Sequence, residues 1–338
     1  MKLYAGLDLH KNNSYIGIVD SDNKPIYKNR LANDLSGILA ALKPYESELE
    51  SIAVESTFNW YWLVDGLMAD KHNVRLANPC AIKQYDGMKY SDDDRDALHL
   101  ANLLRLDILP EGYIYPKEER PTRDLLRKRL MLVRQRTSHI LSFQNLVCRN
   151  TGQCFKSGDI KKFEIAQLEP LLHDGHLVLS GRMSIEQIKF LSQQIKLIED
   201  EVTKVSKLRS EYANLLSVPG IGKILALTIM LETGDISRFK SVGSYASYCR
   251  LVQSVRISNG KHKGSGNRKC GNKYLSWAYV EAANFAVRYS PEIHKYHQRK
   301  TAKTNAIVAR KTIAHKLARA CYWIMKNGEV FDISRAFS

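Results

Sequence analysis

The sequence lacks the patterns that mark several common classes of protein. Its six cysteines form no C-x-x-C pair, and no group of cysteine and histidine has the spacing of a zinc site. No apolar run approaches the roughly 18 residues of a membrane span. The chain opens with a strand-like run and not with a signal peptide. We therefore expect free thiols, a cytoplasmic location and no association with a membrane.

Acidic residues are scarce in the C-terminal two thirds of the chain. Residues 117–338 contain 39 lysines and arginines against 18 aspartates and glutamates, a net charge of +21, whereas residues 1–116 contain 12 against 17, a net charge of −5. An acidic head joined to a strongly basic body favours a partner made of phosphates. A solvated basic surface is the simpler alternative. A length of 338 residues with 44% hydrophobic residues is enough for two or three domains.

Four acidic residues occupy positions where a carboxylate is costly. Asp8 follows the strand-like run Leu3–Leu7, and Glu55 follows a second apolar run. Asp93 and Asp96 lie three apart at the start of a helical pattern, so they share one face. Carboxylate oxygens suit Mg²⁺, and two such ions about 3.5–4 Å apart can clamp a phosphate during an in-line displacement. The four acids therefore predict a metal-dependent phosphotransferase that acts on nucleic acid.

The first 116 residues alternate strands and helices. We predict strands at 3–7, 14–19, 25–30, 51–54 and 74–77, and helices at 33–42, 60–71 and from 93 onward. Three strands followed by a helix, a strand, a helix and a strand is the order of a ribonuclease-H-like fold. In that order the first and fourth strands lie side by side, which would bring Asp8 and Glu55 together. Either Asn33 or Asp34 is expected to cap the first helix.

Beyond residue 118 the strand signals fade and long helices are predicted. One basic helix covers residues 122–150, and others cover 224–231, 273–288 and 304–326. A further helix carries apolar residues in a heptad spacing at Ile188, Leu191, Ile195, Ile198, Val202 and Val205. This spacing is typical of helix pairing. An intrachain hairpin of two long helices and an intermolecular coiled coil both satisfy it.

Three segments of the basic body are suited to nucleic acid. The turn Leu216–Lys223 contains Gly220, Gly222 and Lys223, and it resembles a helix-hairpin-helix that binds a DNA backbone at a helix N-terminus. An ordinary corner between two helices is the alternative. The last helix has a basic face that is solvated or lines nucleic acid, at Arg310, Lys311, Lys316 and Arg319.

The third segment, residues 250–272, is dense in glycine, hydroxyl and basic side chains, and we call it the serine loop. Its basic residues are Arg256, Lys261, Lys263, Arg268 and Lys269, among others. Such a loop can stabilise a pentavalent phosphate. By composition alone it is a flexible phosphate-binding loop, and a serine nucleophile is the sharper alternative.

Read together, these segments resemble the DEDD transposases of the insertion-sequence-110 group, which include the Piv-type DNA invertases. The resemblance covers nearly the whole chain. It is carried in order by Gly6-Leu7-Asp8, Val54-Glu55-Ser56-Thr57, Asp92-Asp93-Asp94-Arg95-Asp96-Ala97, Val218-Pro219-Gly220-Ile221-Gly222, and Ser258 through Lys269-Cys270-Gly271-Asn272. Each motif alone is weak, and their order and spacing are specific.

The resemblance implies a RuvC-like domain at 1–116 in which Asp8, Glu55, Asp93 and Asp96 bind Mg²⁺. It implies a helical coiled-coil segment at 117–210 and a mainly helical transposase domain at 211–338. The family serine, which attacks DNA and forms a covalent phosphoserine link, matches Ser258; Ser254 and Ser265 are the alternatives. The family often has Ser-Gly where this chain has Ser258-Asn259-Gly260, and asparagine tolerates the left-handed backbone that such a turn needs.

The resemblance also implies partners: target and donor DNA, a structured noncoding bridge RNA that pairs with both, and a second copy of the chain in a dimer or tetramer. We therefore expect a site-specific, RNA-guided DNA recombinase associated with the prokaryotic nucleoid. One rival is a RuvC-like junction nuclease in which water attacks, and the basic body with its serine loop argues against it. Another is a non-enzymatic nucleic-acid-binding protein with a degenerate nuclease fold, and the intact set of four acids argues against that.

Overall fold

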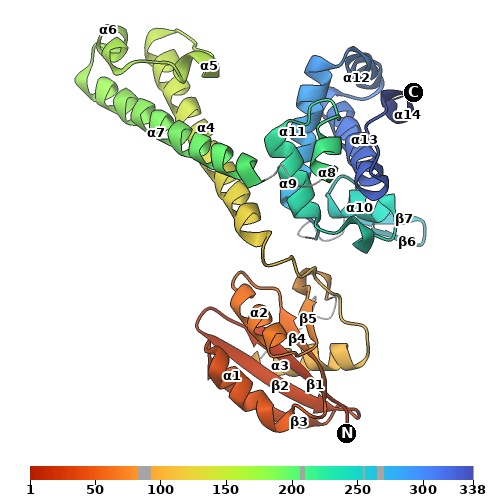
Figure 1. The fold of residues 1–338 in the computed structure, drawn as a ribbon. Coiled ribbons are helices and arrows are strands. Elements are labelled where there is room, and N and C mark those ends of the chain that lie inside the picture. The colour runs from red at the N-terminus through yellow and green to blue at the C-terminus, as the bar shows by residue number, and fades with distance from the viewer. Residues whose placement is uncertain (83–92, 206–209, 254–255, 265–269, 338) are drawn as a thin grey trace. The chain divides into compact units, whose positions relative to one another are not determined.

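The computed structural model describes residues 1–82, 93–205, 210–253, 256–264 and 270–337. The chain divides into two compact units (Figure 1). The first unit is Met1–Lys117 with Asn267–Cys270, and the second is Glu118–Gly266 with Gly271–Ser338. The first unit is mixed α/β and the second is mostly helical.

A five-stranded sheet forms the centre of the first unit. Its strands are β1 (Leu3–Leu9), β2 (Asn13–Asp20), β3 (Pro25–Ala32), β4 (Leu49–Glu55) and β5 (Val74–Ala77), in the order β3-β2-β1-β4-β5. The first three strands are antiparallel, and β4 runs parallel to both β1 and β5. The prediction that the first and fourth strands lie side by side is therefore confirmed. The arrangement is compatible with a DEDD nuclease-like fold.

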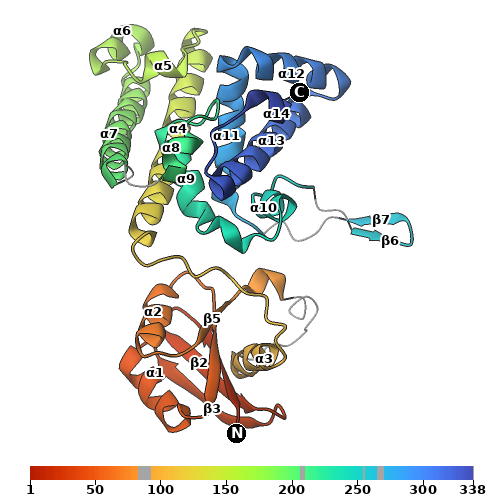
Figure 2. The same ribbon diagram turned by 45° about the vertical axis from the view of Figure 1, so that its right-hand side comes forward.

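Helices cover both faces of this sheet. Helices α1 (Leu35–Leu42) and α2 (Tyr61–Ala69) lie on one side and α3 (Asp93–Arg105) on the other (Figure 2). Successive strand residues point to opposite faces. Leu3, Ala5, Leu7 and Leu9 of β1 accordingly share a core with α1 and α2. Asp34 caps α1 by accepting a hydrogen bond from the Gly37 amide, as one of the two predicted caps.

Gly6 sets how closely α3 approaches the sheet. A Cβ atom at Gly6 would lie 2.1 Å from the carbonyl oxygen of Ala97 and 2.7 Å from the amide nitrogen of Ala101. Only glycine leaves room for a helix backbone at this distance. Ala97 directly follows Asp96, so this contact places the beginning of α3 against β1, two residues from Asp8.

Two long helices form an intrachain hairpin in the second unit. Helix α4 (Arg120–Thr151) and helix α7 (Gly175–Val205) are antiparallel, because Arg129 bonds to Glu199 while Arg136, one heptad later, bonds to Ser192. Of the heptad residues, Ile188, Leu191, Ile195 and Val202 are buried and Ile198 is partly buried; the side chain of Val205 lies outside the description. The intrachain alternative thus accounts for the predicted seam.

Short elements cover the tip of this hairpin, inside the range 117–210 for which the resemblance implied only a helical coiled-coil segment. They are α5 (Ser157–Ile160), the 3-10 turn Ile165–Gln167 and α6 (Leu168–Leu172). Together with both long helices they enclose a separate small core that contains Phe143, Phe163, Leu168 and Ile185.

The rest of the second unit is a helical bundle around one large core. Its helices are α8 (Ser210–Leu215), α9 (Lys223–Thr233), α10 (Val242–Tyr248), α11 (Lys273–Tyr289), α12 (Pro291–Lys303), α13 (Ala306–Asn327) and α14 (Ile333–Phe337). Helix α9 is almost fully buried along its length. The sequence did not predict helices α8, α10, α12 and α14, nor a two-stranded ribbon of β6 (Arg256–Ser258) and β7 (Lys261–Gly264). Within the described ranges, no helix is both long and apolar enough to cross a membrane.

We expect the heptad seam to be needed for folding of this unit. Replacing Ile195 and Ile198 together by aspartate puts two charges into the hairpin interface and should cost several kcal/mol. The neighbouring Leu197→Asp is the matched control, because Leu197 is 62% exposed and its change should cost less than about 0.5 kcal/mol. Thermal unfolding and light scattering measure both. A well-folded double variant with an unchanged melting temperature would argue against the intrachain hairpin.

Candidate functional site

Three of the four predicted acids lie close together at one end of the sheet, where the inner strands β1 and β4 end. Leu7 of β1 pairs with Val54 of β4, so Asp8 and Glu55 are the next residues along two adjacent parallel strands. Asp8 lies on the same face of β1 as Gly6, and Glu55 on the same face of β4 as Ala53, which is the face that α3 covers. Asp96, in the first turns of α3, completes the group. The side chain of Asp93 lies outside the described side chains.

Asp8 and Asp96 lie close enough to Glu55 to change its proton affinity. Asp8 is only 5% exposed. Burial, a hydrogen bond with Asp8, and the charges of Asp8 and Asp96 raise the pKa of Glu55 to about 8. Two neighbouring carboxylates that share one proton are the usual result of like charges in a poorly solvated position. At neutral pH and without a cation, Glu55 therefore holds a proton.

Two histidines beside these acids were not predicted as part of the site. The Nε2 atom of His10 lies 3.1 Å from Oδ2 of Asp8. His99 lies one turn after Asp96 on α3; burial lowers its pKa, and the charge of Asp96 opposes that effect. The spacing of Asp8 to His10 along an extended chain, and of Asp96 to His99 along a helix, contained the signal, because each pair shares a face.

The donor set suits a divalent cation with oxygen ligands. Among the described side chains, no three histidine, cysteine, aspartate or glutamate groups lie in a geometry that would hold a metal ion. The chemistry of the acids nevertheless fits Mg²⁺. All are hard carboxylate ligands, and burial and the neighbouring charges, which together raise the pKa of Glu55, are both effects that a cation between these groups would offset.

Ser258 lies at the end of β6, next to a tight turn. In the ribbon Ser258 pairs with Lys261, and Asn259 and Gly260 connect them with φ values of 50° and 70°. Two successive residues with positive φ make a two-residue hairpin turn, for which Asn-Gly is the preferred sequence. The expected left-handed asparagine is therefore present. Within the serine loop, residues 256–264 therefore form a hairpin, and the prediction of a phosphate-binding loop stays a prediction. Ser258, Lys261 and Lys263 are exposed.

The two ends of the serine loop are fastened to each other. The amide of Asn272 donates a hydrogen bond to the Tyr248 carbonyl oxygen at 2.6 Å, and Nε of Arg250 donates to the Gly271 carbonyl oxygen at 3.1 Å. The Asn272 side chain caps α11 by accepting hydrogen bonds from the amides of Tyr274 and Leu275. The loop therefore leaves and re-enters the bundle at one fixed place.

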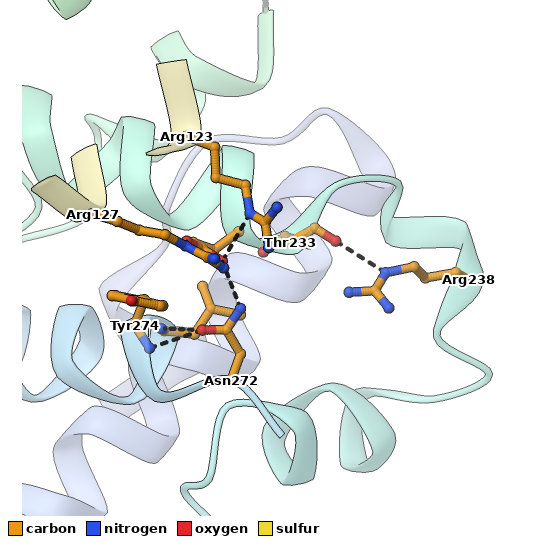
Figure 3. Close-up of polar contacts among 8 residues, drawn as sticks. Arg123, Arg127, Thr233, Arg238, Asn272 and Tyr274 are labelled. Atoms are coloured by element: carbon orange, nitrogen blue, oxygen red, sulfur yellow. Dashed lines mark hydrogen bonds and ion pairs between the residues drawn. The ribbon is translucent and has the colours of Figure 1, made fainter. Parts of the chain in front are cut away.

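A buried ion network supports that place (Figure 3). Glu232 of α9, 2% exposed, accepts hydrogen bonds from Arg123 and Arg127 of α4 and from the side-chain amide of Asn272. Burial by itself would raise the pKa of Glu232, but the hydrogen bond from Arg127, the charges of both arginines and the bond from Asn272 together lower it. The guanidinium of Arg127 also stacks 4.3 Å from the ring centre of Tyr274. The network joins three helices at the root of the serine loop.

Glu232→Gln should strongly destabilise the second unit. It leaves two arginine charges next to a neutral amide in the interior, and breaking a buried ion pair costs about 3–5 kcal/mol. Because the folded pKa of Glu232 is lowered, its contribution is present above the unfolded pKa and is lost as pH falls through the folded value. The control is Glu186→Gln, which breaks an exposed pair with Arg182 and should cost less than about 1 kcal/mol.

Calorimetric unfolding of both variants at pH 7 and at pH 4 measures these effects. The difference in the free energy of unfolding between Glu232→Gln and the wild-type protein should be smaller at pH 4 than at pH 7. Equal stabilities at pH 7 would show that the network contributes nothing.

The other predicted nucleic-acid contacts are partly explained by packing. A Cβ atom on Gly220 would lie 2.2 Å from the Ala282 carbonyl oxygen, so this glycine is required by the close approach of α11. Gly222, the N-terminal cap of α9, has open space around it, and both Gly222 and Lys223 are exposed. Lys316, predicted on a basic face, is half-buried and donates a hydrogen bond to the Ala336 carbonyl oxygen.

Several predicted residues lie outside the description. Ser254, Ser265, Arg268 and Lys269 lie outside the described residues, and so does the side chain of Arg256.

A mixed sheet with carboxylates at the ends of two adjacent parallel strands, joined in one chain to a basic helical unit, defines an enzyme of the nucleic-acid-processing class. Two family models match the chain. One for DEDD transposases of the IS110 type, described as "Transposase", matches residues 5–149. One described as "Transposase IS116/IS110/IS902 family" matches residues 212–298. The two segments make up more than half of the sequence. The chain belongs to this family of transposases, and it is a DNA transposase or recombinase.

Relatives of the chain include transposases and an invertase. It is 22% identical over 342 residues to the transposase for insertion sequence element IS1328 of Yersinia enterocolitica, with 97% of this chain and 98% of that protein covered. It is 24% identical over 292 residues to the transposase for IS1111A of Coxiella burnetii, with 84% and 78% covered. It is 23% identical over 349 residues to the pilin gene-inverting protein of Moraxella bovis, with 98% of each covered.

Proposed function

We propose that this transposase is a site-specific DNA recombinase that a structured noncoding RNA guides to its target and donor DNA. In this proposal Asp8, Glu55, Asp93 and Asp96 bind Mg²⁺, and Ser258 is the nucleophile. The domain boundaries at residues 116 and 210, and assembly into a dimer or tetramer, remain part of the proposal.

The cluster of three carboxylates at the ends of β1 and β4 is the observation that supports the proposal. Asp8, Glu55 and Asp96 come from β1, β4 and α3, and burial, together with the hydrogen bond and charge of Asp8 and the charge of Asp96, raises the pKa of Glu55. A protein gains no stability from crowding carboxylates in this way, because like charges in a poorly solvated place repel. Perturbed acids of this kind are typical of a site for chemistry.

The proposed reaction has two transfers at phosphorus. Mg²⁺, when bound, supplies charge that polarises the scissile phosphate and promotes ionisation of an attacking hydroxyl. The Oγ atom of Ser258 forms a bond to phosphorus, and the sugar hydroxyl that it displaces leaves with the serine proton. A hydroxyl end of the second DNA then attacks the phosphoserine, which restores the serine and joins the strands. The acids and Ser258 come together either within one chain or across two copies.

The rival activity is a metal-dependent junction nuclease in which water attacks. It needs the acids but not the serine loop. What favours recombination is the loop itself: an Asn259-Gly260 hairpin presents an exposed serine beside Lys261 and Lys263. The C-terminal family match, at residues 212–298, covers this segment, and the N-terminal match, at residues 5–149, does not.

A reconstituted strand-exchange assay tests the proposed function. The protein is incubated with Mg²⁺, two labelled DNA duplexes that carry the target and donor sites, and the RNA transcribed from the sequence flanking the gene. Recombinant DNA should form only when the RNA is present. Recombination without RNA would remove the guide from the proposal, and cleaved but unjoined DNA would favour the nuclease.

Duplex binding should be strongly salt-dependent, and the loop lysines should contribute. The slope of log K against log salt is about −0.9 per phosphate contact. Lys261→Gln with Lys263→Gln should therefore reduce the slope by roughly 2 if both contact the backbone. Lys24→Gln with Lys71→Gln, two exposed lysines of the acidic unit, is the matched control and should leave the slope unchanged. Equal slopes for both double variants would exclude the loop lysines as contacts.

A further inference from the structure

A pocket lies in the C-terminal part of the second unit, beyond both segments that the family models match. Helix α13 forms one wall, and the segment that follows it, residues 329–336, forms the other. The two lie side by side in both views (Figures 1 and 2). The pocket has a volume of about 480 Å³. That is within the usual range for a small-molecule site and too small for a duplex.

The far wall is held in place by hydrogen bonds from other parts of the bundle. Asn214 donates to the Gly328 carbonyl oxygen, Ser217 accepts from the Phe331 amide, and Lys316 donates to the Ala336 carbonyl oxygen. The Phe337 ring packs edge-on against Tyr296. The cavity is therefore a built feature of the bundle and not a gap beside a loose end of the chain.

The acidic groups that line the pocket are engaged within the chain. Glu329 pairs with Arg335 at 3.3 Å, and Asp332 accepts hydrogen bonds from the Ser334 amide and hydroxyl. Arg335 offsets the charge of Glu329, whereas Asp332 keeps its negative charge. Lys316 and Arg319 on the other wall outweigh that one charge, so the lining is positive overall.

That wall presents an imidazole, a guanidinium and an indole on one stripe. His315, Arg319 and Trp323 follow one another at four-residue intervals of α13, so they share a face. Within the described part of the chain, no carboxylate or carbonyl pairs with His315 or Arg319. Burial, and then the positive charges of the neighbouring Arg319 and Lys316, lower the pKa of His315. Trp323 is 44% exposed.

We propose that this pocket binds one unpaired nucleotide of a single-stranded nucleic acid, with the base stacked on Trp323 and the phosphate held by Arg319 and His315. A partly exposed indole next to unpaired cationic and imidazole side chains is the combination that proteins use for unpaired nucleotides, since every base has a stacking face and every nucleotide a phosphate. One helical turn separates Arg319 from Trp323, about 6 Å along the axis, so both reach a single nucleotide. A duplex does not fit, because its bases are stacked on each other.

The inference rests on nucleic acid being the partner of this protein, and it adds a specific contact. The nucleotide comes either from a loop of the guide RNA or from a displaced DNA strand. The chemistry is the same in both, so the source is left to the test.

Photocrosslinking and affinity measurements on the full-length protein test the pocket. Three pentamers serve as probes. One is made of uridine and one of thymidine, each with 5-bromouracil as its central base, and the third is abasic and of equal charge. Irradiation should attach the brominated base to the α13 peptide that contains Trp323. Trp323→Ala should weaken both base-containing pentamers about tenfold or more and leave the abasic one unchanged.

Arg319→Gln should weaken all three probes, because it removes a phosphate contact. Phe190→Ala, an exposed aromatic on α7 outside the pocket, is the matched control and should change nothing. A larger loss for uridine assigns the nucleotide to RNA, and a larger loss for thymidine assigns it to DNA.

Two results would overturn the proposal: crosslinks that map away from α13, or affinities for Trp323→Ala equal to those for Phe190→Ala. Either result, together with normal binding of duplex DNA, would contradict the proposal for this pocket and leave the proposed function standing. If the wild-type protein bound neither the duplex nor any pentamer, that result would instead contradict the function proposed above.

Discussion

Glu55→Gln is expected to abolish strand cleavage while making the metal-free protein more stable. The glutamine keeps the shape of the side chain but is a poor ligand for Mg²⁺ and has no charge. Loss of one ligand from such a site should reduce cleavage by about 10³-fold or more. Glu50→Gln is the matched control, since Glu50 lies on the same strand, is exposed and pairs with Lys2 at the surface.

The gain in stability follows from the sign of the pKa shift. The pKa of Glu55 is raised from 4.5 to about 8, so the folded state favours the protonated carboxyl. Below about pH 4.5 the group is protonated in both states and has no effect. As pH rises to 8 the unfolded chain ionises first, and the wild-type protein loses stability that the glutamine variant keeps. Because Glu55 is only half-buried, we expect a difference of about 1–2 kcal/mol at pH 8.

Mg²⁺ should reverse the order of stability, so that the wild-type protein becomes more stable than Glu55→Gln. A cation that binds the folded state stabilises it by mass action, so millimolar Mg²⁺ should raise the melting temperature of the wild-type protein and of Glu50→Gln but not that of Glu55→Gln. Thermal unfolding at pH 5 and pH 8, with and without Mg²⁺, measures both effects without requiring activity. Cleavage at the wild-type rate by Glu55→Gln would contradict the assignment of this residue to the metal site.

The position of Asp8 and Glu55 could be predicted because local patterns determine it. Both follow short apolar runs, and the order of strands and helices places those runs side by side. The position of α3 could be predicted only in part. The spacing of Asp93 and Asp96 predicts a shared helix face, but the contact of Gly6 with Ala97 that brings α3 to the sheet joins residues 91 apart in sequence.

The interactions that shape the second unit were harder to predict, because their partners are far apart. Glu232 stands within an otherwise apolar helix, and its partners Arg123 and Arg127 come more than 100 residues earlier. Nothing in the spacing of α4 distinguishes these two arginines from the many others on that helix. The β6–β7 ribbon is different, since the Asn259-Gly260 pair alone indicates a hairpin. Its short strands were hidden by a composition typical of loops.

Ser258→Ala is expected to abolish the covalent protein–DNA adduct, and with it recombination, by about 10³-fold or more. The change removes the oxygen that we propose attacks the phosphate, and little else. Ser258 is exposed, and the turn beside it is fixed by the backbone of Asn259 and Gly260, so the hairpin should persist. Affinity for DNA and RNA should stay near the wild-type value, because one hydroxyl adds little to an interface dominated by charge.

The comparison needs three variants and one trap. Wild type, Ser258→Ala, Ser254→Ala and Ser265→Ala are incubated with guide RNA, labelled DNA and Mg²⁺, and the products are separated on denaturing gels. A substrate that lacks the attacking hydroxyl on the second DNA holds the reaction at the phosphoserine stage. The adduct should disappear in Ser258→Ala alone.

An adduct that persists in Ser258→Ala but is lost in one of the other two variants would move the nucleophile to that serine. Recombination without an adduct in any of the four proteins, even with the trapping substrate, would mean that water or a DNA hydroxyl attacks directly. The carboxylate edge of the first unit would then account for the whole reaction, and the exposed hairpin of the second unit would serve only to hold DNA.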